Sequence, residues 1–73
     1  MADESVVKDL VNRFTFHPAE GDQPERYAAI RSFALELALL IEDNAPHSRE
    51  RSLAFTKLQE AVMWANAAIA VNE

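Results

Sequence analysis

The chain has 73 residues, a formal net charge of −5 and no cysteine, so we expect one domain, residues 1–73, without disulfides or thiolate metal sites. Twelve Asp and Glu against seven Lys and Arg argue against long DNA or RNA, and against an anionic membrane, because such polyanions are bound by basic surfaces. No apolar run reaches the roughly 18 residues of a membrane span. The acidic N-terminus is unlike a signal peptide, so we expect a cytoplasmic protein.

The first third of the sequence predicts a short helix and then an extended arm. The helix runs from about Asp3 to Arg13, because its apolar residues recur at i, i+1, i+4 and i+5 and so form one narrow stripe. This stripe consists of Val6, Val7, Leu10 and Val11. The arm follows at 14–21, where aromatic and β-branched residues lead into a turn at Pro18 and Gly21.

The rest of the sequence predicts two long helices. The second helix opens at Asp22, which stands at capping-box spacing from Glu25 and is followed by Pro24 in the first turn, and it runs to about Asp43. Ser48 is the predicted N-cap of a third helix that runs to about Val71. Two such helices joined by a short loop form an antiparallel hairpin, so the expected fold class is all-α.

Both long helices contain a stretch that is apolar on almost every side. Glu36 is the only polar residue of 33–41, and Asn66 is the only polar residue of 61–71. A surface helix is normally polar on one face, and a 73-residue monomer cannot cover both stretches. We therefore expect a homo-oligomer; the alternative is a monomer with an unusually apolar surface.

Catalytic and metal chemistry find little support in the sequence. His17 and His47 lack a second histidine at metal-ligand spacing, and the serines lack a neighbouring base. The carboxylates lack the paired spacing of a helical nucleotide pyrophosphohydrolase. We expect no enzyme, no metal and no cofactor. His17, beside Pro18, is either a ligand-contacting imidazole or a turn histidine bonded to backbone.

An aromatic and basic group lies around the arm and the start of the second helix. It consists of Arg13, Phe14, Phe16, Arg26, Tyr27 and Arg31. Tyr27 and Arg31 share a helix face. Aromatic rings stack on bases and guanidinium groups bind phosphates, so the group suits a nucleotide-sized anion. From spacing alone the commoner interpretation is that the aromatic residues are core or interface and the arginines pair with nearby carboxylates.

Several short runs match one family of proteins. They are RFTFHP at 13–18, ERY at 25–27 with IR at 30–31, LALLI at 37–41, SRERSLA at 48–54 and MWANAAIA at 63–70, followed by NE at 72–73. Together they resemble the anti-CBASS sponge proteins of bacteriophages, which belong to the same broader group as the anti-Thoeris sponges. The resemblance covers about residues 12–73, and the run with Met63 and Trp64 is the most specific.

The resemblance implies a helical homo-oligomer, a hexamer in the relatives, in the cytoplasm of the infected bacterial host. It implies binding, without cleavage, of cyclic oligonucleotides that bacterial immune synthases make. Cyclic dinucleotides such as cyclic GMP-AMP and cyclic di-AMP would occupy pockets between protomers, and some members hold cyclic trinucleotides in separate pockets. The competing function class is a small helical oligomeric adaptor that binds a host protein.

The resemblance also assigns residues. Phe16, next to His17, would stack on a base, and Arg31 would contact phosphate, with Arg26 the second choice. Phe16 stands where the relatives have tyrosine, which keeps the stacking ring and removes a hydroxyl. Val71, before Asn72, stands where the relatives have an arginine of the trinucleotide pocket, so trinucleotide binding is in question.

Overall fold

The computed structural model describes residues 3–73 and contains three helices and no strand within them. The helices are α1 (Glu4–Arg13), α2 (Gln23–Asn44) and α3 (Arg49–Asn72). The predicted all-α class and all three predicted helices are therefore confirmed, with ends that agree to about one residue. The arm between α1 and α2 contains neither helix nor strand: residues 14–15 and 21–22 turn, and residues 16–20 between them have no regular secondary structure.

Two of the three helix starts are capped by side chains. The Asp3 carboxylate accepts hydrogen bonds from the Ser5 backbone N–H and hydroxyl, both at 2.8 Å, and these bonds lower the pKa of Asp3. The Ser48 hydroxyl accepts from the Arg51 N–H at 3.1 Å, which confirms the predicted cap of α3.

The predicted capping box at Asp22 is wrong. The Asp22 side chain makes no hydrogen bond to the helix start; its Oδ1 lies 3.3 Å from the Arg26 Nε instead. A carboxylate at i and a guanidinium at i+4 lie on the same helix face, so Arg26 competes with the backbone for Asp22. Pro24 does occupy the first turn of α2, as predicted.

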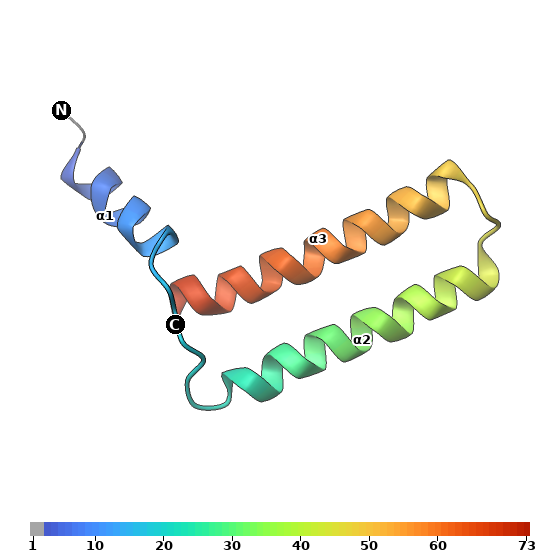
Figure 1. Ribbon diagram of the computed structural model, residues 1–73, viewed down its shortest axis with the longest axis horizontal. Helices are drawn as coiled ribbons and strands as arrows, with labels where there is room; N and C mark the ends of the chain where they lie inside the picture. The colour runs from blue at the N-terminus through green and yellow to red at the C-terminus, as the bar shows by residue number, and fades with distance from the viewer. Residues whose placement is uncertain (1–2) are drawn as a thin grey trace.

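The helices α2 and α3 run antiparallel and pack along each other as a hairpin (Figure 1). Arg51 closes the loop end: its Nη1 donates to the carbonyls of Ala45 at 3.2 Å and Glu42 at 3.4 Å. These are carbonyls of the last turn of α2 and its C-cap, which the helix itself cannot satisfy. Arg51 is therefore a structural residue of the hairpin loop.

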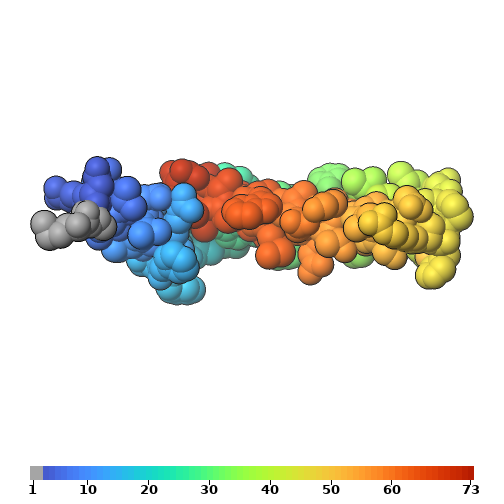
Figure 2. All heavy atoms as spheres, turned by 90° about the horizontal axis from the view of Figure 1, so that it is seen from above, coloured from blue at the N-terminus to red at the C-terminus, as the bar shows by residue number. Residues whose placement is uncertain are grey.

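At the open end of the hairpin, α1 projects away from both long helices (Figure 1). One hydrogen bond ties it back, from the Asn12 Nδ2 to the Val71 carbonyl at 3.0 Å. The chain measures 51 × 32 × 13 Å, and Figure 2 shows this single layer from its edge. Its radius of gyration of 16.5 Å exceeds the value of about 11 Å for a compact domain of this length.

A single chain has no hydrophobic core among its described residues. No apolar side chain of residues 3–73 is buried, and the one buried residue is Gln23, 8% exposed. Phe33 and Trp64 are 71% and 73% exposed. The accessible surface is 6021 Å², against about 4,500 Å² expected for a compact monomer of this mass. None of the helices in residues 3–73 is long and apolar enough to cross a membrane.

Candidate functional site

The arm between α1 and α2 presents two bare aromatic rings. Phe14 and Phe16 are each 85% exposed, so residues 3–73 leave most of both rings uncovered. Phe14 is the C-cap of α1, where its N–H donates to the Leu10 carbonyl at 3.1 Å, and Phe16 follows in the part of the arm without regular secondary structure. An exposed ring on a short, tethered arm is a suitable platform for base stacking.

His17 is half-buried, and its Nε2 lies 2.8 Å from the Asn12 carbonyl oxygen. A carbonyl oxygen only accepts, so Nε2 carries the proton in this contact. This is the backbone-bonded turn histidine that the sequence left open as one of two interpretations. The other interpretation, contact with a ligand, stays a prediction.

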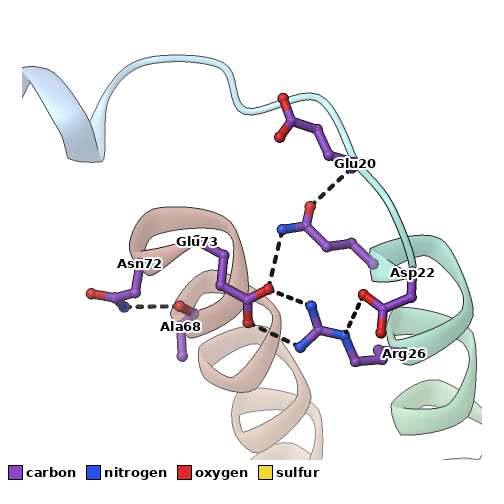
Figure 3. Close-up of polar contacts among 7 residues, drawn as sticks. Glu20, Asp22, Arg26, Ala68, Asn72 and Glu73 are labelled. Carbon is purple, nitrogen blue, oxygen red and sulfur yellow. Dashed lines mark hydrogen bonds and ion pairs between the residues drawn. The ribbon is translucent and has the colours of Figure 1, made fainter.

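Arg26 is paired with two carboxylates. Its Nη1 donates to the Glu73 Oε2 at 2.9 Å, its Nη2 pairs with the Glu73 Oε1, and its Nε faces Asp22 (Figure 3). The hydrogen bond between Arg26 and Glu73 is the main cause of both pKa shifts: it raises the pKa of Arg26 and lowers the pKa of Glu73. A phosphate that reached Arg26 would have to displace Glu73.

Arg31 is exposed on α2 and makes no ion pair or side-chain hydrogen bond with any of residues 3–73. Tyr27 is half-buried one turn earlier on the same face. Of the two arginines that the resemblance offers for phosphate, Arg31 is thus the one whose guanidinium group has no ion-pair or hydrogen-bond partner among the described residues. Its role stays a prediction.

Arg13, Val71 and Asn72 line one hollow between α1 and the end of α3, together with Asn12 and the exposed Trp64. Arg13 pairs with Asp9 at 3.0 Å, an exposed i,i+4 contact of little strength. Val71 is half-buried, and the Asn72 side chain donates to the Ala68 carbonyl at 2.8 Å (Figure 3). The structure thus places Arg13 beside the two residues assigned to the second pocket. Neither Phe16 nor Arg31 lines this hollow.

The sequence reasoning missed Gln23 and Glu73. Gln23 accepts from the Glu20 N–H at 3.0 Å, and its Nε2 lies 3.5 Å from the Glu73 Oε1. The burial of a glutamine at the start of a helix has no signature in the sequence. Glu73 does belong to the closing Asn-Glu pair of the resemblance, which was the one available signal.

The polar groups of the residues described above are guanidinium, amide and carboxylate groups. Within residues 3–73, no three His, Asp or Glu side chains are grouped so as to hold a metal ion. Exposed aromatic rings and guanidinium groups are the groups with which proteins stack on bases and pair with phosphates.

Comparison with known proteins identifies the family. The family model for the Acb2/Tad1 hairpin domain matches residues 7–70, which take in most of α1, the arm and nearly the whole hairpin. The match begins five residues before the resemblance noted in the sequence, and it ends before Val71 and Asn72. No curated protein and no solved structure gives a significant match. Because the match spans well over half of the chain, the protein belongs to the Acb2/Tad1 family, the anti-CBASS and anti-Thoeris sponges.

Proposed function

We propose that this protein is a phage immune-evasion sponge that binds cyclic dinucleotides, such as cyclic GMP-AMP and cyclic di-AMP, in the cytoplasm of the infected host. The family match over residues 7–70 carries the proposal, because members of this family are sponges that bind cyclic nucleotide signals. In our proposal the ligand is held away from its effector and is released intact.

Self-association is the second part of the proposal, with a hexamer favoured. The exposed surface exceeds that of a compact monomer by about 1,500 Å². A standard interface buries about 800 Å² on each partner, so the excess suits contacts with more than one copy. An apolar hollow along the hairpin, lined by Ile30, Phe33, Leu37, Leu58 and Val62, supports a second copy as its occupant.

The binding pocket that we propose lies between protomers. A cyclic dinucleotide carries two bases and two phosphates, so it has near two-fold symmetry. Two copies that meet about a two-fold axis would each supply the bare Phe16 ring and the unpaired Arg31 guanidinium. The exposure of both groups in a single chain supports this arrangement, because a partner and a ligand would cover them.

Binding without cleavage is supported by the chemistry of the described residues. A general acid or base works best when its pKa lies near the operating pH. Hydrogen bonds lower the pKa of the Asp3 and Glu73 carboxyl groups, which is the wrong direction for either group to act as a general acid near neutral pH. The groups proposed for contact with the ligand, Phe16 and Arg31, stack and pair but do not activate water.

A thermal-shift and recovery experiment tests the proposal. Micromolar cyclic dinucleotide should raise the melting temperature, because a ligand that binds only the folded state stabilises it by mass action. After heat denaturation, mass spectrometry should recover the cyclic ligand intact. Linear products that accumulate with time would indicate an enzyme. No thermal shift with any member of a cyclic dinucleotide panel would favour the adaptor that binds a host protein.

A further inference from the structure

The arm that carries Phe16 is held by polar contacts rather than by a core. Residues 16–20 have no regular secondary structure, and the Phe16 ring, 85% exposed, makes too few packing contacts to fix its own orientation. An untethered arm would lose backbone and side-chain entropy each time a base stacked on that ring. What holds the arm therefore affects how tightly the ring can bind.

Asn12 holds the start of the arm. Its carbonyl accepts from the His17 Nε2 at 2.8 Å, which closes a short loop that contains Phe16. Its side-chain Nδ2 donates to the Val71 carbonyl at 3.0 Å. One residue therefore ties the loop around Phe16 to the last turn of α3.

Gln23 holds the end of the arm. Gly21, with a φ of +56°, allows a tight turn in which the Gln23 N–H donates to the Glu20 carbonyl at 2.9 Å. The Gln23 side chain bonds back to the Glu20 N–H at 3.0 Å and reaches the Glu73 carboxylate at 3.5 Å. Arg26 holds that carboxylate in place (Figure 3).

Both connections converge on residues 71–73. We propose that Asn12 and Gln23 are positioning residues, which orient the Phe16 ring for base stacking by tying the two ends of the arm to the end of α3. This inference rests on the proposed cyclic-dinucleotide function. It also explains why Gln23 is buried. Gln23, the one buried residue among the described residues, lies in α2 and joins the arm at Glu20 to the end of α3 at Glu73.

Fluorine NMR on protein labelled with 4-fluorophenylalanine reports on the ring without any ligand. The chain has four phenylalanines, and Phe16→Leu identifies the Phe16 signal among them. Asn12→Ala and Gln23→Ala should each shift or sharpen that signal and leave the signals of Phe33 and Phe55, which lie in the hairpin helices, in place. Gln59→Ala is the matched control, because it removes the same side chain from an exposed position on α3.

Calorimetry with cyclic di-AMP and cyclic GMP-AMP gives the second readout. Asn12→Ala removes the side-chain hydrogen bond to Val71, and Gln23→Ala removes the side-chain hydrogen bonds to Glu20 and Glu73. Because these bonds pre-organise the arm, each variant should lower the affinity about 5- to 30-fold. The double variant that combines Gln23→Glu with Glu73→Gln exchanges the two side chains. The carboxylate at position 23 can still accept from the Glu20 N–H, and the amide at position 73 can donate to that carboxylate. The double variant should restore the Phe16 signal and part of the affinity that Gln23→Glu alone loses.

The outcomes separate this inference from the proposed function. Wild-type protein that binds neither dinucleotide overturns the proposed function, whatever the spectra show. A Phe16 signal that stays unchanged in both alanine variants overturns the positioning role, whatever the affinity. A changed signal with wild-type affinity also overturns it. If all four phenylalanine signals of Gln23→Ala change to those of an unfolded chain, the double variant provides the test instead. The inference is overturned if the double variant restores neither the Phe16 signal nor any of the affinity.

Discussion

Arg26 and Glu73 are 47 positions apart in the sequence and meet in a two-point ion pair. Both Nη atoms of the guanidinium group face the carboxylate, one of them at 2.9 Å, so the first turns of α2 are joined to the end of α3. This pair closes the open end of the hairpin, as Arg51 closes the loop end. Because Glu73 already neutralises the charge of Arg26, Arg31 is the stronger candidate for contact with a phosphate group of the ligand.

Acid should weaken this ion pair. Arg26 holds the pKa of Glu73 below its ordinary value of 4.5, so the folded chain binds that proton less tightly than the unfolded chain does. The stabilisation is therefore present above pH 4.5 and is lost as the pH falls through the lowered folded pKa. Between about pH 5 and pH 3, the wild-type melting temperature should fall more than that of Glu73→Gln. Parallel curves for the two proteins would contradict a role of the pair in stability.

Phe16 and Phe14 form a matched pair, because both are 85% exposed and lie two residues apart in the chain. Phe16→Ala should lower the affinity for cyclic dinucleotide about 5- to 150-fold, the usual loss for one stacked base. Phe14→Ala should have little effect, and Phe16→Tyr should match or exceed the wild type because it keeps the ring and adds a hydroxyl. Calorimetry measures all three. If Phe16→Ala dissociates the oligomer, its ring is an interface residue.

Alanine substitutions of Arg31 and Arg26 should have different effects: the first should weaken ligand binding, and the second should lower the stability of the fold. Arg31→Ala should lower the affinity about 10- to 150-fold, because it removes a charge-assisted phosphate contact, with little change in melting temperature. Arg26→Ala should lower the melting temperature, because it leaves Glu73 without its guanidinium partner. Titration and thermal unfolding of both variants check this. The reverse pattern would make Arg26 the phosphate ligand.

The helices could be predicted from the sequence because their signals are local. Ser48 caps α3 through a hydrogen bond to a residue three positions away, and Pro24 sits in the first turn of α2. Asp22 is the N-cap residue of α2, as predicted, but the predicted capping box does not form, because the helix start and Arg26 compete for the Asp22 carboxylate within one turn. The contact of Arg26 with Glu73 could not be predicted, because it depends on the register of the whole hairpin.

The surface of the hairpin should drive assembly. Light scattering should give a mass several times 8.2 kDa, with a hexamer favoured, and Phe33→Glu should reduce it because it places a charge in the apolar hollow. Ser32→Glu adds the same charge one residue away, at an exposed polar position, and should leave the mass unchanged. A wild-type monomer at micromolar concentration would contradict both the oligomer and a pocket between protomers.

The final prediction concerns Val71 and cyclic trinucleotides. Val71 lines the hollow between α1 and α3, where Arg13 is the one basic residue and already pairs with Asp9. Arg51 cannot substitute within the same chain, because it is held at the loop end, about 30 Å away along α3. Wild-type protein should therefore bind cyclic triadenylate weakly or not at all while it still binds cyclic dinucleotides.

Val71→Arg should create or strengthen binding of cyclic triadenylate, because it adds a guanidinium group beside Arg13 where phosphates can be paired. The same change should lower the melting temperature without ligand, since like charges near one another repel until an anion arrives. Val71→Gln is the control, with a long polar side chain and no charge, and it should gain nothing. Calorimetric titration of the three proteins with cyclic triadenylate decides the question. Tight binding by the wild type would show that a valine at this position leaves the second pocket working.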